Sequence, residues 1–165
     1  MRERCIDWGE VSRLCSIIEG RIRDDGVSVG CILAVVRGGL VPATIISNML
    51  SVHDLLFIRA IHYDRLSRDA HSTYDYEYDG VGIAYITPIE KIRERVEEFG
   101  DEEGRIMLVV DDIADTGLTL KAISQLLTKS IRMATLYMKH RSLLRPDYYA
   151  DTCSDDEWIV FPWER

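Results

Sequence analysis

Residues 106–120 read IMLVVDDIADTGLTL, and this stretch carries the pattern that decides the fold. Its first five residues are apolar, as in a buried strand of a parallel sheet. Two adjacent carboxylates, Asp111 and Asp112, follow, then comes Asp115, and Gly117 leads into a predicted helix. A strand, a polar loop and a helix in this order are typical of α/β folds, in which ligands bind at the carboxyl ends of the strands.

The polar loop in this stretch suits a phosphate group. Backbone N–H groups and hydroxyls at the start of a helix bind anions, and Gly117 lets the backbone approach the anion without a Cβ in the way. Asp111 and Asp112 can accept hydrogen bonds from a vicinal diol or hold a hydrated divalent metal. Asp115 can serve as a proton acceptor. The plainer alternative is a solvated cluster of carboxylates in which Asp115 and Thr116 cap the helix.

Apolar runs alternate with amphipathic segments through the rest of the chain. We expect strands at residues 29–36, 54–63, 83–87, 105–110 and 131–139, and helices at 8–23, 40–50, 89–100 and 118–129. The strands are nearly continuous in apolar residues, which predicts a Rossmann-like, mostly parallel α/β sheet flanked by helices. Residues 64–82 are too polar for a core and too long for an ordinary connection, so we expect a mobile loop there.

The chain's 165 residues fit one domain, and its net charge of −8 limits the partners. An acidic balance argues against duplex nucleic acid, but metal ions and backbone amides can still hold a phosphate-bearing small molecule. No apolar stretch approaches the roughly 20 residues of a membrane span, and the N-terminus lacks the apolar core of a signal peptide. The four cysteines show no metal-binding spacing. We therefore expect a cytoplasmic protein without disulfides, nucleic-acid partner or membrane contact.

The pattern D-D-x-x-D-T-G at residues 111–117 resembles the phosphoribosyl-diphosphate signature of type I phosphoribosyltransferases. A chance match in a chain of this length has odds of roughly one in ten thousand. The resemblance implies that Asp111 and Asp112 bind the ribose hydroxyls and, directly or through water, Mg²⁺, and that Asp115 is the general base near the purine N7. It also implies a loop that wraps the 5′-phosphate, formed by Ala114, Asp115, Thr116, Gly117, Leu118 and Thr119.

Residues 34–43, AVVRGGLVPA, are closely similar to the loop after the first strand of xanthine–guanine-type purine phosphoribosyltransferases. The resemblance implies that the backbone amides of Arg37, Gly38 and Gly39 bind pyrophosphate. It also makes the peptide between Arg37 and Gly38 the candidate for a cis bond. The plainer alternative is a strand-to-helix turn, which requires glycines in any case.

The C-terminal tail resembles the hood of archaeal-type and bacterial 6-oxopurine enzymes. The resemblance implies one domain with a core at residues 1–139 and a hood at 140–165 that recognises the base. Lys139 matches the donor to the purine O6, Trp158 the aromatic that stacks on the base, and Ile159 the residue whose carbonyl meets its edge. For Trp163 we expect simple packing onto the core. The polar stretch at 64–82 matches the family's flexible catalytic loop, with candidate pyrophosphate contacts at Tyr63, Arg65 and Arg68.

Taken together, the resemblance implies an Mg²⁺-dependent transferase. It would move a phosphoribosyl group from 5-phosphoribosyl 1-diphosphate to N9 of hypoxanthine, guanine or xanthine, giving a nucleoside 5′-monophosphate and pyrophosphate for purine salvage. Relatives are commonly homodimers or homotetramers. Two alternatives stay open, a non-catalytic regulator that binds the same diphosphate and a phosphoribosyltransferase for another base. A prenyl-diphosphate reading of D-D-x-x-D is disfavoured, because that motif lies in large all-helical proteins.

Overall fold

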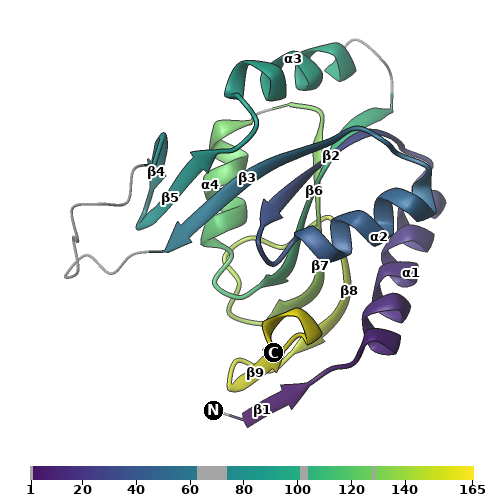
Figure 1. Cartoon of the computed structure of the whole chain (residues 1–165), viewed down its shortest axis with the longest axis vertical. Coiled ribbons are helices and arrows are strands. Elements are labelled where there is room, and N and C mark those ends of the chain that lie inside the picture. The colour runs from purple at the N-terminus through teal and green to yellow at the C-terminus, as the bar shows by residue number, and fades with distance from the viewer. Residues whose placement is uncertain (1, 63–73, 101–103, 128) are drawn as a thin grey trace.

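The computed structural model describes residues 2–62, 74–100, 104–127 and 129–165 (Figure 1). The strands are β1 (Arg2–Cys5), β2 (Ser28–Val36), β3 (Leu55–His62), β4 (Tyr76–Tyr78), β5 (Val81–Tyr85), β6 (Arg105–Ala114), β7 (Ile131–Lys139), β8 (Tyr148–Cys153) and β9 (Glu157–Val160). The helices are α1 (Trp8–Asp24), α2 (Leu40–Leu50), α3 (Ile89–Gly100), α4 (Leu118–Leu126) and the 3-10 turn η1 (Pro162–Glu164).

The main sheet has the strand order β4-β5-β3-β2-β6-β7-β8. The five strands from β3 to β8 in this order run parallel, and β5 and β4 add an antiparallel edge. The predicted mostly parallel α/β sheet is therefore confirmed. Strands β2 and β6 lie side by side at its centre, so the loops that follow them meet at one edge.

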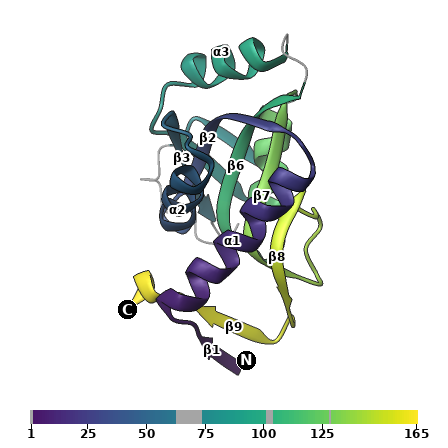
Figure 2. The ribbon, with the colours of Figure 1, turned by 90° about the vertical axis from the view of Figure 1, so that its right-hand side faces the viewer.

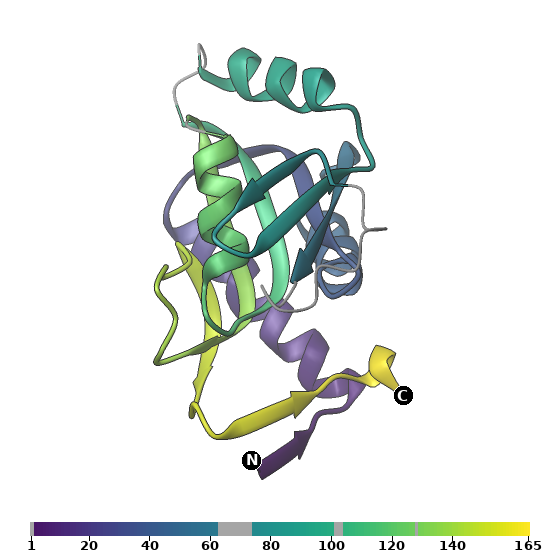
Figure 3. The same ribbon diagram turned by 90° about the vertical axis from the view of Figure 1, so that its left-hand side faces the viewer.

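Helices cover both faces of the sheet. Helices α1 and α2 lie on one face and α4 on the other, with α3 packed at the far end of that second face (Figures 2 and 3). Alternate residues of β6 divide between two apolar cores, with Leu108 in the core under α1 and α2 and Val109 in the core under α3 and α4. Helix α1 begins where the sequence predicts, because the Asp7 carboxylate accepts a hydrogen bond from the Glu10 N–H at 2.8 Å.

The prediction of a mobile loop at residues 64–82 is wrong for the second half of that stretch. Residues 76–85 form the hairpin of β4 and β5, with a turn at Asp79 and Gly80, both of which have positive φ. Alternation hides this strand in the sequence, since Tyr76 and Tyr78 pack against the core while Glu77 between them is exposed. The first half of the loop, with Tyr63, Arg65 and Arg68, lies outside the described residues.

Two other boundaries differ from prediction by three residues or more. Strand β6 continues past Val110 to Ala114, because β7 runs alongside it and pairs Asp111 with Thr135 and Ala114 with Met138. Asp111 and Asp112 are thus strand residues rather than loop residues. Helix α4 ends at Leu126, because Leu127 adopts an extended conformation.

The C-terminal hood is tied to the N-terminus. Strand β9 pairs in parallel with β1, which the sequence analysis missed because its residues, RERC, are mostly charged and exposed. Strand β8 instead joins the main sheet beside β7. All four cysteines are free, and within the described residues no helix is both long and apolar enough to cross a bilayer.

Candidate active site

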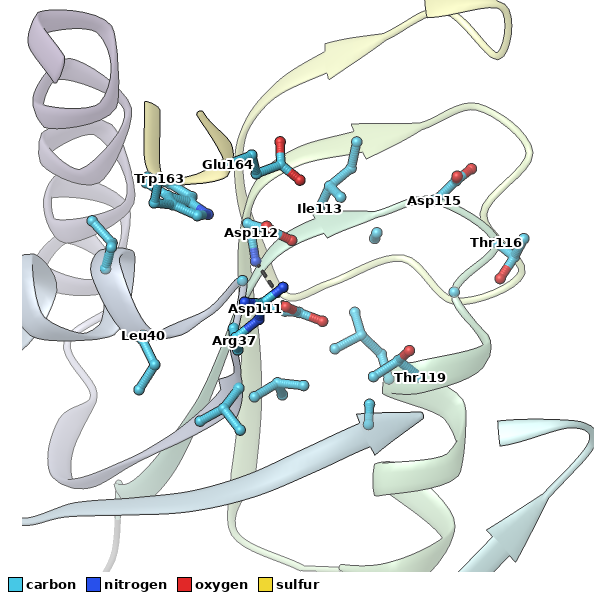
Figure 4. A pocket seen from close by; sticks show the side chains of 18 of the residues that line it. Arg37, Leu40, Asp111, Asp112, Ile113, Asp115, Thr116, Thr119, Trp163 and Glu164 are labelled. Carbon is cyan, nitrogen blue, oxygen red and sulfur yellow. Dashed lines mark hydrogen bonds between the residues drawn. The ribbon is translucent and has the colours of Figure 1, made fainter. Parts of the chain in front are cut away.

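A cavity of about 830 Å³ opens at the carboxyl ends of β2 and β6 (Figure 4). Its wall combines the loop after β2, the end of β6 with the start of α4, and the C-terminal turn η1. The predicted site residues that line it are Arg37, Gly38, Asp111, Asp112, Ala114, Asp115, Thr116, Gly117 and Thr119. Two motifs separated by about seventy residues of sequence are therefore brought together at the edge where α/β sheets bind ligands.

Asp111 and Asp112 place two carboxylates in this cavity. The Asp112 N–H donates to Asp111 Oδ1 at 3.0 Å. Burial, followed by the negative charge of Asp112, raises the pKa of Asp111 well above its usual range. Burial, with a contribution from the Glu164 carboxylate, raises the pKa of Asp112 to about 6. Within the described ranges neither carboxylate forms an ion pair, and both line the cavity, so they are placed to bind a metal or a diol.

The loop after β2 provides space for these carboxylates. A Cβ on Gly38 would lie 2.3 Å from Asp112 Oδ2, and one on Gly39 would lie 2.2 Å from the Val110 carbonyl oxygen. Only glycine therefore lets this loop pack against β6. The cis peptide joins Val36 to Arg37, one residue before the predicted position at Arg37 and Gly38. That prediction was wrong by one residue.

The start of α4 is shaped for a close backbone approach. Gly117 is the N-cap and has a left-handed φ of 77°, a conformation that favours glycine. Because glycine has no side chain, the N-terminus of the helix is left uncovered. The segment after β7 supports it from behind, since the Leu143 N–H donates to the Thr116 carbonyl at 2.8 Å. A Cβ on Gly117 would lie 2.6 Å from Ser142 Oγ. The helix N-terminus thus presents its positive dipole end to the cavity.

Asp115 is held by two cations from the end of β7 and the segment after it. Arg141 donates to Asp115 Oδ1 from Nε at 2.7 Å and also from Nη2. The Lys139 ammonium lies 3.4 Å from the same oxygen, and its side chain is only 2% exposed. Sequence reasoning singled out Lys139 but missed Arg141, because no local pattern links two residues that are 26 positions apart.

The two tryptophans near the C-terminus lie differently relative to the cavity. Ile159 is buried, but Trp158 is 47% exposed and is not part of the cavity wall. Trp163 instead lines the cavity, stacked on Phe161 with ring centroids 4.7 Å apart. Its indole N–H is buried and has no hydrogen-bond partner among the described residues. The expectation of simple packing for Trp163 therefore misses its place in the wall, although it does pack on the core.

Metal binding can be judged from the available donors. No group of three or more His, Cys, Asp or Glu side chains in the described part of the chain is arranged to hold a metal ion by itself. Mg²⁺ commonly binds through one or two carboxylates together with water and substrate phosphates. Asp111 and Asp112, two hard oxygen donors lining a cavity, fit that mode.

A family model described as a phosphoribosyl transferase domain matches residues 9–164. The chain belongs to the phosphoribosyltransferase family. It is 30% identical over 159 residues to the xanthine-guanine phosphoribosyltransferase of Desulfotalea psychrophila, covering 96% of this chain and 84% of that protein. The corresponding protein of Nitratidesulfovibrio vulgaris is also 30% identical, with 96% and 83% covered.

Solved phosphoribosyltransferase structures share the fold. A purine phosphoribosyltransferase from Pyrococcus horikoshii superposes with a TM-score of 0.71 at 30% identity, over 100% of this chain and 95% of that one. A xanthine-guanine-hypoxanthine phosphoribosyltransferase from Helicobacter pylori gives 0.73 at 19% identity, over 99% and 94%, and supports the fold alone. The predicted resemblance to type I, purine-type phosphoribosyltransferases is confirmed, and the chain is accordingly a phosphoribosyltransferase.

Proposed function

We propose that this phosphoribosyltransferase acts on 6-oxopurines, transferring the phosphoribosyl group of 5-phosphoribosyl 1-diphosphate to purine N9 in purine salvage. The observation that carries the proposal is the meeting of the three motif carboxylates and the start of α4 in one cavity. The choice of purine is supported by the curated relatives, which are named for xanthine and guanine. Hypoxanthine, guanine and xanthine share the 6-oxo group, and a buried cation at Lys139 suits that acceptor.

In this proposal the loop after β2 and the segment from β6 to α4 bind the diphosphate substrate. Asp111 and Asp112 accept hydrogen bonds from the ribose hydroxyls, and the N-terminus of α4 binds the 5′-phosphate. The loop at Arg37 and Gly38 meets the pyrophosphate. A bound Mg²⁺ would neutralise charge on the leaving pyrophosphate, with Asp111 and Asp112 as its protein ligands, directly or through water. Holding both reactants in line lowers the entropic part of the barrier.

Asp115 is assigned the proton chemistry. As N9 bonds to the anomeric carbon and pyrophosphate leaves, the purine must give up a proton, and a carboxylate at Asp115 takes or shares it. Lys139 donates a hydrogen bond to O6, where negative charge collects as the proton leaves. Stacking on the base by Trp158 and an edge contact from Ile159 remain predictions. A cytoplasmic location and a homodimer or homotetramer remain predictions as well.

The test is a set of initial rates with hypoxanthine, guanine, xanthine and adenine, at saturating 5-phosphoribosyl 1-diphosphate and with Mg²⁺ present or chelated. We expect nucleotide formation with at least one 6-oxopurine, little with adenine, and loss on chelation. Asp115→Asn should lower kcat by about 100-fold while KM for the diphosphate changes little.

Three results would contradict the proposal in different ways. Adenine as the best substrate would remove the role given to Lys139. Full activity of Asp115→Asn would remove the role given to that carboxylate. Binding of the diphosphate without nucleotide formation from any base would point to the regulator alternative.

A further inference from the structure

The arginine beside Asp115 has no role in the proposed reaction so far. Arg141 lies two residues after the end of β7, and its backbone N–H donates to Asp155 Oδ1 at 2.9 Å. The next residues are fixed to the phosphate loop, because the Leu143 N–H donates to the Thr116 carbonyl. Arg141 is thus anchored on one side to the turn between β8 and β9, and on the other to the loop between β6 and α4, unlike an arginine on a free surface loop.

The contacts on Asp115 are all made to one of its two oxygens. Among the described residues, Arg141 Nε, Arg141 Nη2 and Lys139 Nζ all approach Oδ1, and none of the contacts found there involves Oδ2. The planar guanidinium grips with two N–H groups, so it fixes the direction of the carboxylate as well as its charge. Oδ2 is then the oxygen left for a substrate proton.

The contact between Arg141 and Asp115 also affects the charge balance of Lys139. A buried ammonium needs a compensating charge, and Asp115 supplies it. If Asp115 depended on Lys139 alone, the ammonium would be drawn onto the carboxylate and away from a substrate carbonyl. Arg141 satisfies Asp115 at shorter distance, 2.7 Å against 3.4 Å, and one positive charge remains uncompensated in this group of three.

We propose that Arg141 is a positioning residue that holds Asp115 Oδ1, leaving Oδ2 to take the purine proton and Lys139 to meet the 6-oxo group. The proposal rests on the proposed purine phosphoribosyl transfer. It assigns Arg141 no contact with the substrate. Its effect should therefore appear in turnover and in the purine KM, and not in binding of the diphosphate.

Arg145 offers a matched control in the same segment. Its guanidinium donates to the Tyr149 hydroxyl at 2.6 Å and lies 5.1 Å from that ring's centroid, and it is not part of the cavity wall. The experiment measures kcat and both KM values for wild type, Arg141→Ala, Arg141→Lys and Arg145→Ala, with thermal unfolding as a folding check.

We expect Arg141→Ala to lower kcat by about 10-fold or more and to raise the purine KM, with the diphosphate KM within about twofold. Arg141→Lys keeps the charge without the two-pronged grip, so it should recover part of the loss, and Arg145→Ala should match wild type. Unchanged or raised kcat in Arg141→Ala, or a loss confined to the diphosphate KM, would overturn the proposal while the function stands. A wild type inactive with every purine would overturn both.

Discussion

The loops after β2 and β6 lie at the same edge of the sheet and make opposite contributions. The loop after β2 contributes close packing, because Gly38 and Gly39 have no Cβ. Its backbone therefore approaches β6 at a distance where any side chain would collide. The segment after β6 gives charge, with three carboxylates facing the cavity and two cations gathered at Asp115. Substitutions in the two loops should therefore fail for different reasons, the first by geometry and the second by electrostatics.

Gly38→Ala should have the largest effect on activity, because its Cβ would enter the space next to the Asp112 carboxylate. In Gly38→Ala the new Cβ would lie 2.3–2.7 Å from the Asp112 carboxylate, so either the carboxylate or the loop must move. A misplacement of about 1 Å can cost about 100-fold in rate, and we expect kcat/KM for the diphosphate to fall by that order. Steady-state kinetics measure it.

Gly20→Ala is the control for this change. Gly20 lies inside α1, and a Cβ there meets nothing within 4 Å. Alanine is a better helix former than glycine, so this variant should keep full activity and gain about 0.5–1 kcal/mol in unfolding free energy. Equal activity of Gly38→Ala and Gly20→Ala would show that the tight approach at Gly38 is not required.

The buried carboxylate of Asp112 should make the free energy of unfolding depend on pH. The pKa of Asp112 is raised to about 6 in the folded protein, so the folded state binds this proton more tightly than the unfolded state does. Its contribution to stability is complete below about pH 4 and is lost as the pH rises through about 6. Asp112→Asn removes the titration, so at pH 8 its free energy of unfolding should exceed that of wild type by about 2 kcal/mol, and at pH 4 the two should agree.

Urea unfolding of both proteins at pH 4 and pH 8 measures this difference. Asp156→Asn is a control with the opposite sign, because a hydrogen bond from the Ser154 hydroxyl lowers the pKa of Asp156. Its stabilising contribution is present at pH 8 and is lost in acid. An Asp112→Asn variant that is no more stable than wild type at pH 8 would show that the ligand-free site does not hold an uncompensated charge.

A smaller effect on substrate binding is expected from Trp163, in the turn η1 that forms the third wall of the cavity. Trp163→Phe keeps the stack on Phe161 and removes the indole N–H that lacks a partner among the described residues. If that N–H donates to a ligand oxygen, KM for the diphosphate should rise about fivefold, the equivalent of one neutral hydrogen bond. Tyr149→Phe, which removes an aromatic side chain's polar group outside the cavity wall, should leave KM unchanged. Matching KM values for the two variants would exclude this role for Trp163.

The two loops could be predicted because their requirements are local. Gly38, Gly39 and Gly117 meet backbone demands, and Asp111, Asp112 and Asp115 lie within five residues of one another, so a short stretch of sequence contains each wall. The order of strands and helices followed from apolar runs for the same reason. Strands β1, β4, β8 and β9 were missed because short strands that are charged or rich in aromatic residues owe their structure to the neighbour with which they pair.

The remaining parts of the site depend on distant contacts. Arg141 reaches Asp115 only because the segment after β7 folds back onto the loop between β6 and α4. Trp163 enters the cavity wall because β9 pairs with β1 and directs η1 toward β6, whereas Trp158 remains exposed. Sequence spacing carries no information on either placement.

Calorimetric titration of 5-phosphoribosyl 1-diphosphate with Mg²⁺ tests the central claim that this sheet edge is the phosphoribosyl-diphosphate site. Wild type and Asp115→Asn should bind with similar affinity, because the proposed role of Asp115 concerns the purine proton and not the diphosphate. The double variant Asp111→Asn, Asp112→Asn should bind about 100-fold more weakly or worse, since charge-assisted hydrogen bonds to the ribose are lost. Equal binding by the double variant, or no binding by wild type, would contradict the account.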